Sequence, residues 1–138
     1  MRSMIMLMLV SLTSIATIAA ANAAREAILA DLAAEAKAAN TAFTGFSAER
    51  GATFFAATHT GGEPDTPSCT TCHTTSPLKP GRTRAGKNIE PMAVSKTPNR
   101  YTDAQEVAKW FRRNCKSVLG RECTAVEKGD FLTFMISQ

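Results

Sequence analysis

The last third of the chain carries the clearest helical pattern. Apolar side chains recur at intervals of three and four between Thr102 and Val118, which indicates a helix with one buried face. Thr102 and Gln105 have the spacing of a capping box at its start, and Gly120 is placed to end it. The side chains expected on the buried face are Val107, Trp110, Phe111, Asn114 and Val118.

A final helix is expected directly afterwards. Thr124 and Glu127 form a second capping-box pair, so this helix should begin next to Thr124. Its inward-facing side chains are expected to be Phe131, Leu132 and Met135.

Two more helices are expected before residue 58. The alanine-rich segment from Arg25 to Ala42 favours a helix, and Gly45 ends it. The next helix takes Ser47 as its N-cap. Within it, Gly51 lies one turn before an aromatic pair, which indicates the close approach of another helix. No strand-like alternation of useful length is present, so the sequence predicts an all-α fold with a loop-rich middle.

The middle of the chain contains the motif Cys69-Thr70-Thr71-Cys72-His73, the attachment pattern of a c-type haem. Two thiols three positions apart on one turn can add to the two vinyl groups of a single porphyrin. The histidine that follows can then bind the iron. A buried cysteine pair or a redox dithiol is the alternative. We therefore expect one covalent haem, attached through Cys69 and Cys72 and ligated by His73.

The first residues have the pattern of a secretory signal peptide. Arg2 supplies the positive charge, Met4–Ile18 the apolar segment, and residues 21–23 the small-residue cleavage site. An uncleaved membrane anchor is the alternative, although the apolar run is short for a bilayer span. We expect a signal peptide over residues 1–23, cleaved near Ala23, and a periplasmic monohaem domain over residues 24–138.

Export to an oxidising compartment favours a disulfide between the remaining cysteines. Four cysteines are present, and haem attachment leaves Cys115 and Cys123. Two free buried thiols are the alternative.

Basic residues are concentrated in the irregular segment from Ser76 to Asn99, and the chain has a net charge of +4. These side chains can pair with haem propionates, present a docking face to an acidic redox partner, or simply be solvated. The residues in question are Lys79, Arg82, Arg84 and Lys87. No aromatic–basic motif points to nucleic acid.

The second axial ligand has several candidates. His59, the only other histidine, lies in a glycine-rich loop, and Met92 offers the usual sulfur ligand. Met135 has the pattern of helix core. Asn114 stands on an apolar helix face, where an unpaired amide costs about 1–3 kcal/mol, so it needs a partner. That partner is either the iron or the backbone at the helix end, and the residues alone favour the backbone.

Several stretches between Ser47 and Ser137 resemble the SHP-type cytochromes c, a small oxygen-binding class related to the class I cytochromes. The matching stretches are Cys69 to His73, Ile89 to Met92, Tyr101 to Asp103, Lys109 to Cys115 and Leu119 to Thr124. The last two are the most specific. The helix before Gly45 lies outside the strong match.

The resemblance implies a class I-like cytochrome c fold around one haem, with an extra N-terminal helix. It also implies that Asn114 is the second axial ligand and that Cys115 and Cys123 form a disulfide. The related c-double-prime cytochromes use two histidines instead, but this chain has asparagine in the motif. As redox partners the resemblance implies a dihaem cytochrome c and a membrane b-type cytochrome.

An asparagine oxygen is a hard, weak donor that suits ferric better than ferrous iron. We therefore expect electron transfer combined with binding of O2, NO or CO to the reduced haem. One alternative is a terminal oxidoreductase that reduces oxygen or oxidises nitric oxide, although no general acid or base stands out. The others are a plain electron carrier with Met92 ligated, and a thiol oxidoreductase using Cys69 and Cys72.

Overall fold

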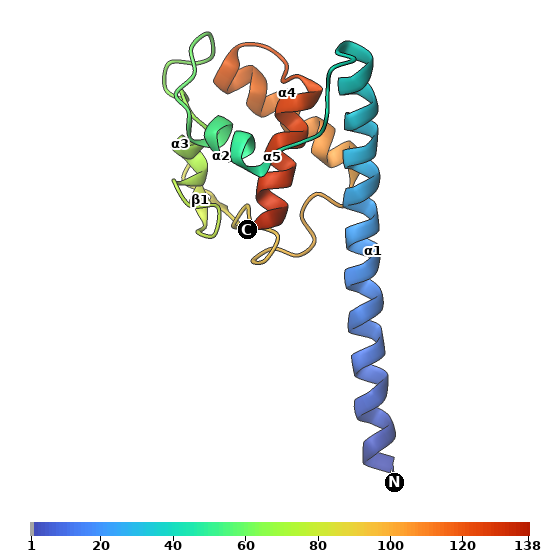
Figure 1. The fold of residues 1–138 in the computed structure, drawn as a ribbon. Coiled ribbons are helices and arrows are strands. Elements are labelled where there is room, and N and C mark those ends of the chain that lie inside the picture. Colours follow the sequence, from blue (N-terminus) through green and yellow to red (C-terminus); the bar gives the residue numbers. More distant parts are fainter. Residues whose placement is uncertain (1) are drawn as a thin grey trace.

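The protein is a mostly helical molecule with a long N-terminal helix (Figure 1). The computed structural model describes residues 2–138, with side chains from residue 15 onward. Its helices are α1 (Arg2–Ala39), α2 (Ala48–Ala56), α3 (Thr70–His73), α4 (Ala104–Leu119) and α5 (Ala125–Ser137). The expected helical class is confirmed.

The irregular middle of the chain contains one small antiparallel ladder, between β1 (Gly81–Arg82) and β2 (Asn88–Ile89). Gly81 pairs with Ile89, and Arg82 with Asn88. The sequence did not predict it, because two-residue strands are too short to show alternation.

Figure 1 shows the second half of α1 lying against the rest of the molecule, whereas its N-terminal half projects away. Residues 15–20 are exposed, and the first buried residue is Arg25. The Arg25 Nε donates to the Arg100 carbonyl at 2.9 Å, and its guanidinium also donates to the Pro98 carbonyl. Ile28 and Ala36 are buried further along the helix. The docked part of α1 therefore begins at Arg25.

The bounds of α1 differ from the expected segment Arg25–Ala42. The helix begins at Arg2 and ends at Ala39, where the Asn40 side chain accepts the Ala42 N–H at 3.0 Å in a local turn. The expected positive charge at Arg2 and most of the apolar segment Met4–Ile18 lie outside the residues whose side chains are described. Within the described part of the chain, no helix has the length and apolar character needed to cross a bilayer.

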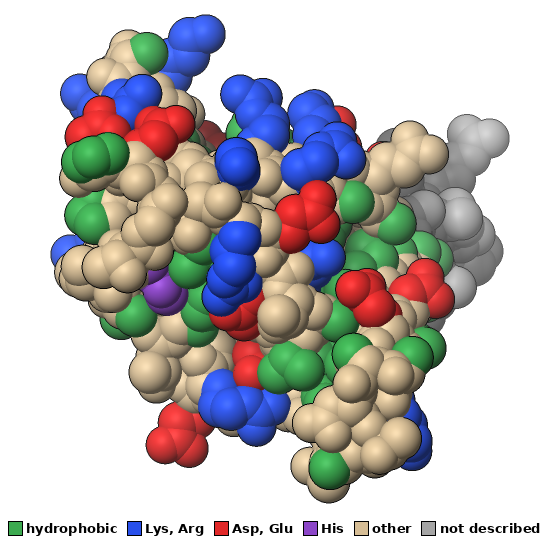
Figure 2. Space-filling view, turned by 90° about the horizontal axis from the view of Figure 1, so that it is seen from above, with side chains coloured by type: hydrophobic (Ala, Val, Ile, Leu, Met, Phe, Trp, Pro, Cys, Tyr) green, Lys and Arg blue, Asp and Glu red, His purple; other side chains and the backbone are tan. Residues whose placement is uncertain are grey.

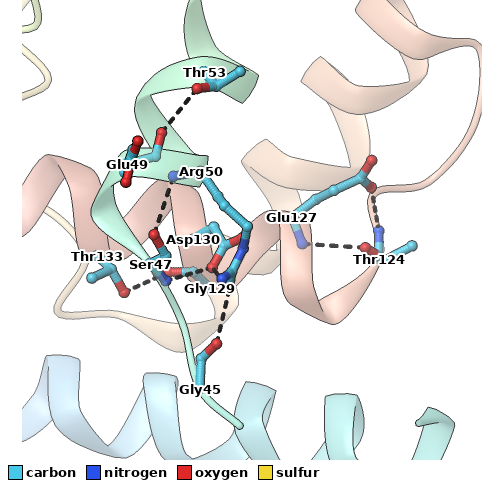
Figure 3. Close-up of polar contacts among 10 residues, drawn as sticks. All are labelled: Gly45, Ser47, Glu49, Arg50, Thr53, Thr124, Glu127, Gly129, Asp130 and Thr133. Atoms are coloured by element: carbon cyan, nitrogen blue, oxygen red, sulfur yellow. Dashed lines mark hydrogen bonds and ion pairs between the residues drawn. The ribbon is translucent and has the colours of Figure 1, made fainter. Parts of the chain in front are cut away.

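Helices α2 and α5 pack closely at Gly51, as its position in the sequence predicted. A Cβ atom there would overlap the carbonyl of Asp130 on α5. Ser47 is the N-cap, and its hydroxyl accepts the Arg50 N–H. Figure 3 shows the buried Asp130 carboxylate accepting from the Ser47 N–H and the Arg50 Nε, both at 2.7 Å. This cluster joins the start of α2 to the middle of α5.

The hydrophobic core lies where α5 meets α1, α2 and the segment around Met92. Its buried side chains are Ile28, Phe55, Met92, Phe131, Leu132 and Met135. Phe131 is in ring contact with Phe55, Tyr101 and Phe111, with centroids 5.5–6.4 Å apart. The expected inward face of the last helix is confirmed, and so is the capping box of Thr124 and Glu127.

Helix α4 begins differently from the prediction. Its N-cap is Asp103, whose carboxylate accepts the N–H groups of Gln105 and Glu106 at 2.8 and 3.0 Å. The Thr102 hydroxyl instead donates to the Asn99 carbonyl, so the expected capping box of Thr102 and Gln105 is wrong. A carboxylate suits this position because it accepts both N–H groups and also interacts favourably with the helix dipole.

Only part of the predicted inner face of α4 is buried. Cys115 and Val118 are buried, and Val107 and Phe111 pack partly against the core. Trp110 is 47% exposed, and Asn114 is exposed as well. The five expected positions cover a wide arc of the helix, and the core rings reach only one side of it. Trp110 and Asn114, one turn apart, share the open side of α4.

Candidate haem site

The two motif cysteines lie on a single helical turn. Cys69 directly precedes α3, and its carbonyl accepts the His73 N–H at 3.1 Å. Cys69 and Cys72 are both half-buried and both free. This turn therefore presents two thiols and one imidazole together, the set that covalent haem attachment requires.

The β1–β2 ladder packs directly on this turn. A Cβ atom on Gly81 would overlap the carbonyl of Cys72 and approach the Cα of His73 to 3.0 Å. The ladder holds the motif in place through backbone contact, a role that the sequence did not reveal.

The environment of His73 suits an iron ligand. Burial, and then the nearby charge of Arg100, lower the pKa of His73 to about 4. The imidazole is therefore neutral at pH 7, which is the form that binds metals. Its buried Nδ1 has no hydrogen-bond partner among the described residues, so no structural hydrogen bond fixes that side of the ring.

Burial shifts the pKa of a motif cysteine upward, whereas a redox dithiol needs a lowered thiol pKa. It raises the pKa of the Cys69 thiol to about 11, so this group stays protonated at neutral pH. Thiol oxidoreductases depend on a thiolate with a lowered pKa. The pair fits haem attachment better than thiol chemistry.

The open side of α4 carries Asn114 beside an aromatic ring. The Trp110 ring has Arg113 5.1 Å and Lys109 5.4 Å from its centroid, and its Nε1 donates to Glu106 at 3.1 Å. Asn114 is exposed rather than buried, so the structure does not support the argument from a buried amide. The structure places the amide on an accessible surface, on the same side of α4 as Trp110.

The other candidate ligands have structural contacts of their own. His59 packs on Phe54, with centroids 5.2 Å apart, and its Nε2 lies 3.1 Å from the Phe54 carbonyl. Met92 is buried in the core, with its carbonyl bound by the Tyr101 hydroxyl at 2.9 Å. Met135 is fully buried. These contacts favour packing roles for all three.

The disulfide between Cys115 and Cys123 is present, as predicted. Both residues are buried, and the bond joins the last turns of α4 to the start of α5. It therefore anchors α4 at the residue next to Asn114.

Four basic side chains were noted in the irregular segment from Ser76 to Asn99. Among the described residues, only Arg84 of these four forms an ion pair. Arg84 binds Glu63 at 3.1 Å and Asp65, both in the loop before the motif. The sequence reasoning missed a second group of basic residues, on α4. Figure 2 shows Lys and Arg side chains across the upper end of the molecule, where α4 lies. The basic residues of α4 are Lys109, Arg112, Arg113 and Lys116.

Residues 41–135 match a family described as a domain of unknown function, DUF1924. The chain is 55% identical over 91 residues to the cytochrome c-type protein SHP of Cereibacter sphaeroides, covering 66% of this chain and 70% of that protein. It is 32% identical over 72 residues to cytochrome c'' of Methylophilus methylotrophus, covering 51% of this chain and 50% of that protein.

Solved structures agree with these relationships. The structure of oxidized SHP, an oxygen-binding cytochrome c, superposes with a TM-score of 0.76 at 46% identity, covering 83% of this chain and 96% of that one. Oxidized cytochrome c'' from Methylophilus methylotrophus gives a TM-score of 0.71 at 26% identity, covering 84% and 95%. Homology to these cytochromes c implies a covalently bound haem. The chain therefore belongs to the DUF1924 family and is an SHP-like c-type cytochrome.

Proposed function

We propose that this chain is a periplasmic monohaem cytochrome that transfers electrons and binds small diatomic molecules when reduced. The observation that carries the proposal is an asparagine, Asn114, on the open side of α4 in a chain 55% identical to SHP. SHP itself is an oxygen-binding cytochrome c.

The haem would be held by the turn around α3. Cys69 and Cys72 would form the two thioether bonds, and neutral His73 would bind one face of the iron. When bound, the haem supplies a redox-active iron that can take a diatomic ligand. One attachment motif is present in the sequence, which supports a single haem.

Asn114 would be the second protein ligand of the iron, through its amide oxygen. A hard, neutral oxygen favours ferric over ferrous iron, so Asn114 would hold the iron less strongly in the reduced protein. It also lowers the reduction potential relative to a methionine ligand. The disulfide at Cys115 anchors the end of α4, so release of the amide would involve the Asn114 side chain more than the whole helix.

The packing of α1 supports export and cleavage after Ala23. Residues 15–20 are exposed, and Arg25, the first buried residue among the described side chains, lies two residues beyond the cleavage site. Cleavage therefore leaves the docked part of α1 intact. The disulfide supports an oxidising compartment such as the periplasm.

Electron exchange would involve acidic protein partners. The family resemblance suggests a dihaem cytochrome c and a membrane b-type cytochrome. Two of the basic residues of α4, Lys109 and Arg113, lie against the Trp110 ring on the open side of the helix. Such a surface steers an acidic partner toward the site.

The test is the optical spectrum of the haem-loaded protein and of its Asn114→Ala variant. We expect covalent haem in both, a changed ferric spectrum in the variant, and faster CO binding by its reduced form. Replacing Met92 by Leu is the matched control and should leave the ferric spectrum unchanged. An Asn114→Ala variant with the wild-type ferric spectrum would contradict the proposal, and a changed Met92→Leu spectrum would favour a methionine-ligated carrier.

A further inference from the structure

The loop that leads into the haem motif binds the last turns of α4. Its Glu63 N–H donates to the Ser117 carbonyl at 2.7 Å. The Thr66 hydroxyl lies 3.0 Å from the Ser117 hydroxyl and 3.3 Å from the same carbonyl. Thr66 is 6% exposed, so water competes little for these hydrogen bonds.

These contacts satisfy a group that the helix itself leaves unpaired. The last four carbonyls of a helix have no partner within it. Ser117 lies within the last turn of α4, which ends at Leu119, and its carbonyl is bound by the loop. The end of α4 is therefore fixed by the haem-attachment segment.

The backbones meet without room for side chains. A Cβ atom on Gly62 would overlap the carbonyls of Ser117 and Val118, and one on Gly120 would overlap the carbonyl of Gly61. Close packing of this kind transmits displacement, because neither backbone can move far without a clash.

The contact links the two sides of the haem site by a short path. Thr66 is three residues before Cys69, and Ser117 is three residues, about one helical turn, after Asn114. A shift of the loop relative to α4 therefore changes how Asn114 lies relative to the haem attachment point.

We propose that the Thr66–Ser117 contact positions Asn114 against the haem iron and so controls how readily a diatomic ligand enters. The inference rests on the function proposed above. Thr66 and Ser117 are positioning residues: they act on Asn114 through α4 and need not touch the haem. Loosening the contact lets the end of α4 shift within the limit set by the disulfide, and it leaves the amide detached for more of the time.

The experiment compares CO association with the reduced, haem-loaded protein and the ferric optical spectrum across a set of variants. Thr66→Val keeps the shape of the side chain and removes its hydroxyl. Ser117→Ala removes the hydroxyl that the Thr66 hydroxyl contacts. Thr66→Ser retains a hydroxyl at position 66 and therefore the hydrogen bond. Thr133→Val is the matched control, because the Thr133 hydroxyl donates to the Gly129 carbonyl at 2.7 Å within α5. Asn114→Ala gives the response expected when the ligand is lost.

We expect Thr66→Val and Ser117→Ala each to speed CO association about fivefold, the factor that corresponds to the net contribution of one hydrogen bond. Their ferric spectra should shift part of the way toward that of Asn114→Ala. Thr66→Ser should return both readouts to wild type, and Thr133→Val should change neither.

Wild-type behaviour of Thr66→Val and Ser117→Ala, alongside a clear change in Asn114→Ala, would overturn the inference and leave the proposed function standing. An equal change in Thr133→Val would also overturn it, because the effect would then be general loosening. If Asn114→Ala itself matches wild type, the ligand assignment fails and the inference fails with it. Should Thr66→Val not load haem, Ser117→Ala gives the same comparison.

Discussion

At Gly51, packing against α5 outweighs the intrinsic preference of a helix for alanine over glycine. In an isolated helix, alanine is favoured over glycine by about 1 kcal/mol. In this protein the Asp130 carbonyl occupies the space that a Cβ atom would need. Tertiary packing therefore opposes helix propensity at this residue.

The first prediction is that Gly51→Ala destabilises the protein, by about 1–3 kcal/mol as is usual for overpacking. Denaturant unfolding of the haem-loaded protein measures the change. Thr53→Ala, on the exposed side of α2, should stay within about 0.5 kcal/mol of wild type. A stabilised Gly51→Ala variant would show that α2 and α5 are not in contact there.

Glu127 is a second residue whose neighbours change a property of its side chain, in this case the pKa of its carboxyl group. Its carboxylate accepts two hydrogen bonds from Arg121, at 2.7 and 2.9 Å, and the Thr124 N–H at 2.8 Å. The hydrogen bonds from Arg121, above all, lower the pKa of Glu127 below its ordinary value of 4.5. Because the folded-state pKa is the lower one, the carboxylate stabilises the fold above pH 4.5, and this stabilisation is lost as the pH falls through the folded-state value.

The second prediction is that Glu127→Gln lowers the free energy of unfolding at pH 7 and that the difference from wild type shrinks below pH 4.5. Unfolding curves measured across that range give the difference directly. The control is Glu122→Gln, an exposed residue whose carboxylate has no ion pair in the described part of the chain. A difference that grows on acidification would contradict the assigned direction of the pKa shift.

At the scale of elements, α4 is tied to its neighbours mainly near its C-terminal end. The disulfide joins Cys115 to Cys123 across eight positions, and the Thr66–Ser117 contact binds the same end from the other side. The N-terminal part of α4 depends on the Asp103 cap and on Val107 and Phe111. The element that carries the proposed ligand is therefore most strongly held close to that ligand.

The third prediction is that removing the disulfide, by Cys115→Ala with Cys123→Ala, lowers the free energy of unfolding by about 2–3 kcal/mol, as a short closed loop implies. Denaturant unfolding of the haem-loaded double variant measures it. Wild-type protein treated with a reductant should show a loss of similar size. A double variant as stable as wild type would mean that packing alone holds the end of α4.

How well each element could be predicted depends on how local its signals are. The start of α5 follows from Thr124 and Glu127, and the end of α4 from Gly120, because each signal acts within one turn. The exposure of Trp110 and Asn114 could not be predicted in this way, because it depends on which side of α4 the core rings reach. The start of α4 was misplaced by one residue because Thr102 and Asp103 are both good caps.

At the scale of the whole molecule, the structure separates a projecting segment from a docked domain. Side chains 15–20 are exposed, whereas Arg25 binds two backbone carbonyls on the far segment around residue 100. Among the first 23 residues, none of the described side chains is buried.

The fourth prediction is that the exported protein begins at Ala24 and keeps the stability of the domain. Intact mass, measured on protein purified from a periplasmic fraction, should equal residues 24–138 plus one haem. Arg25→Ala should lower the free energy of unfolding of this mature protein, because it leaves two carbonyls without their donors. A purified protein that retains residues 1–23 would contradict cleavage after Ala23.

The haem motif could be recognised from five consecutive residues, whereas the proposed second ligand, Asn114, could not. Cys69 to His73 act on one turn, and the structure places them there. Asn114 lies more than forty residues away, and its place depends on the loop contact at Ser117, the disulfide and the side of α4 left open. The helix pattern made Asn114 one of several candidates, and the resemblance to the SHP-type cytochromes favoured it over the others.

Reduction of the purified, haem-loaded protein under carbon monoxide tests the central claim most directly. We predict that the ferrous protein is high-spin before the gas is added and that its optical spectrum shifts fully once CO binds, because Asn114 no longer occupies the sixth position. A low-spin ferrous spectrum that CO leaves unchanged would show a permanent second ligand and would contradict the account.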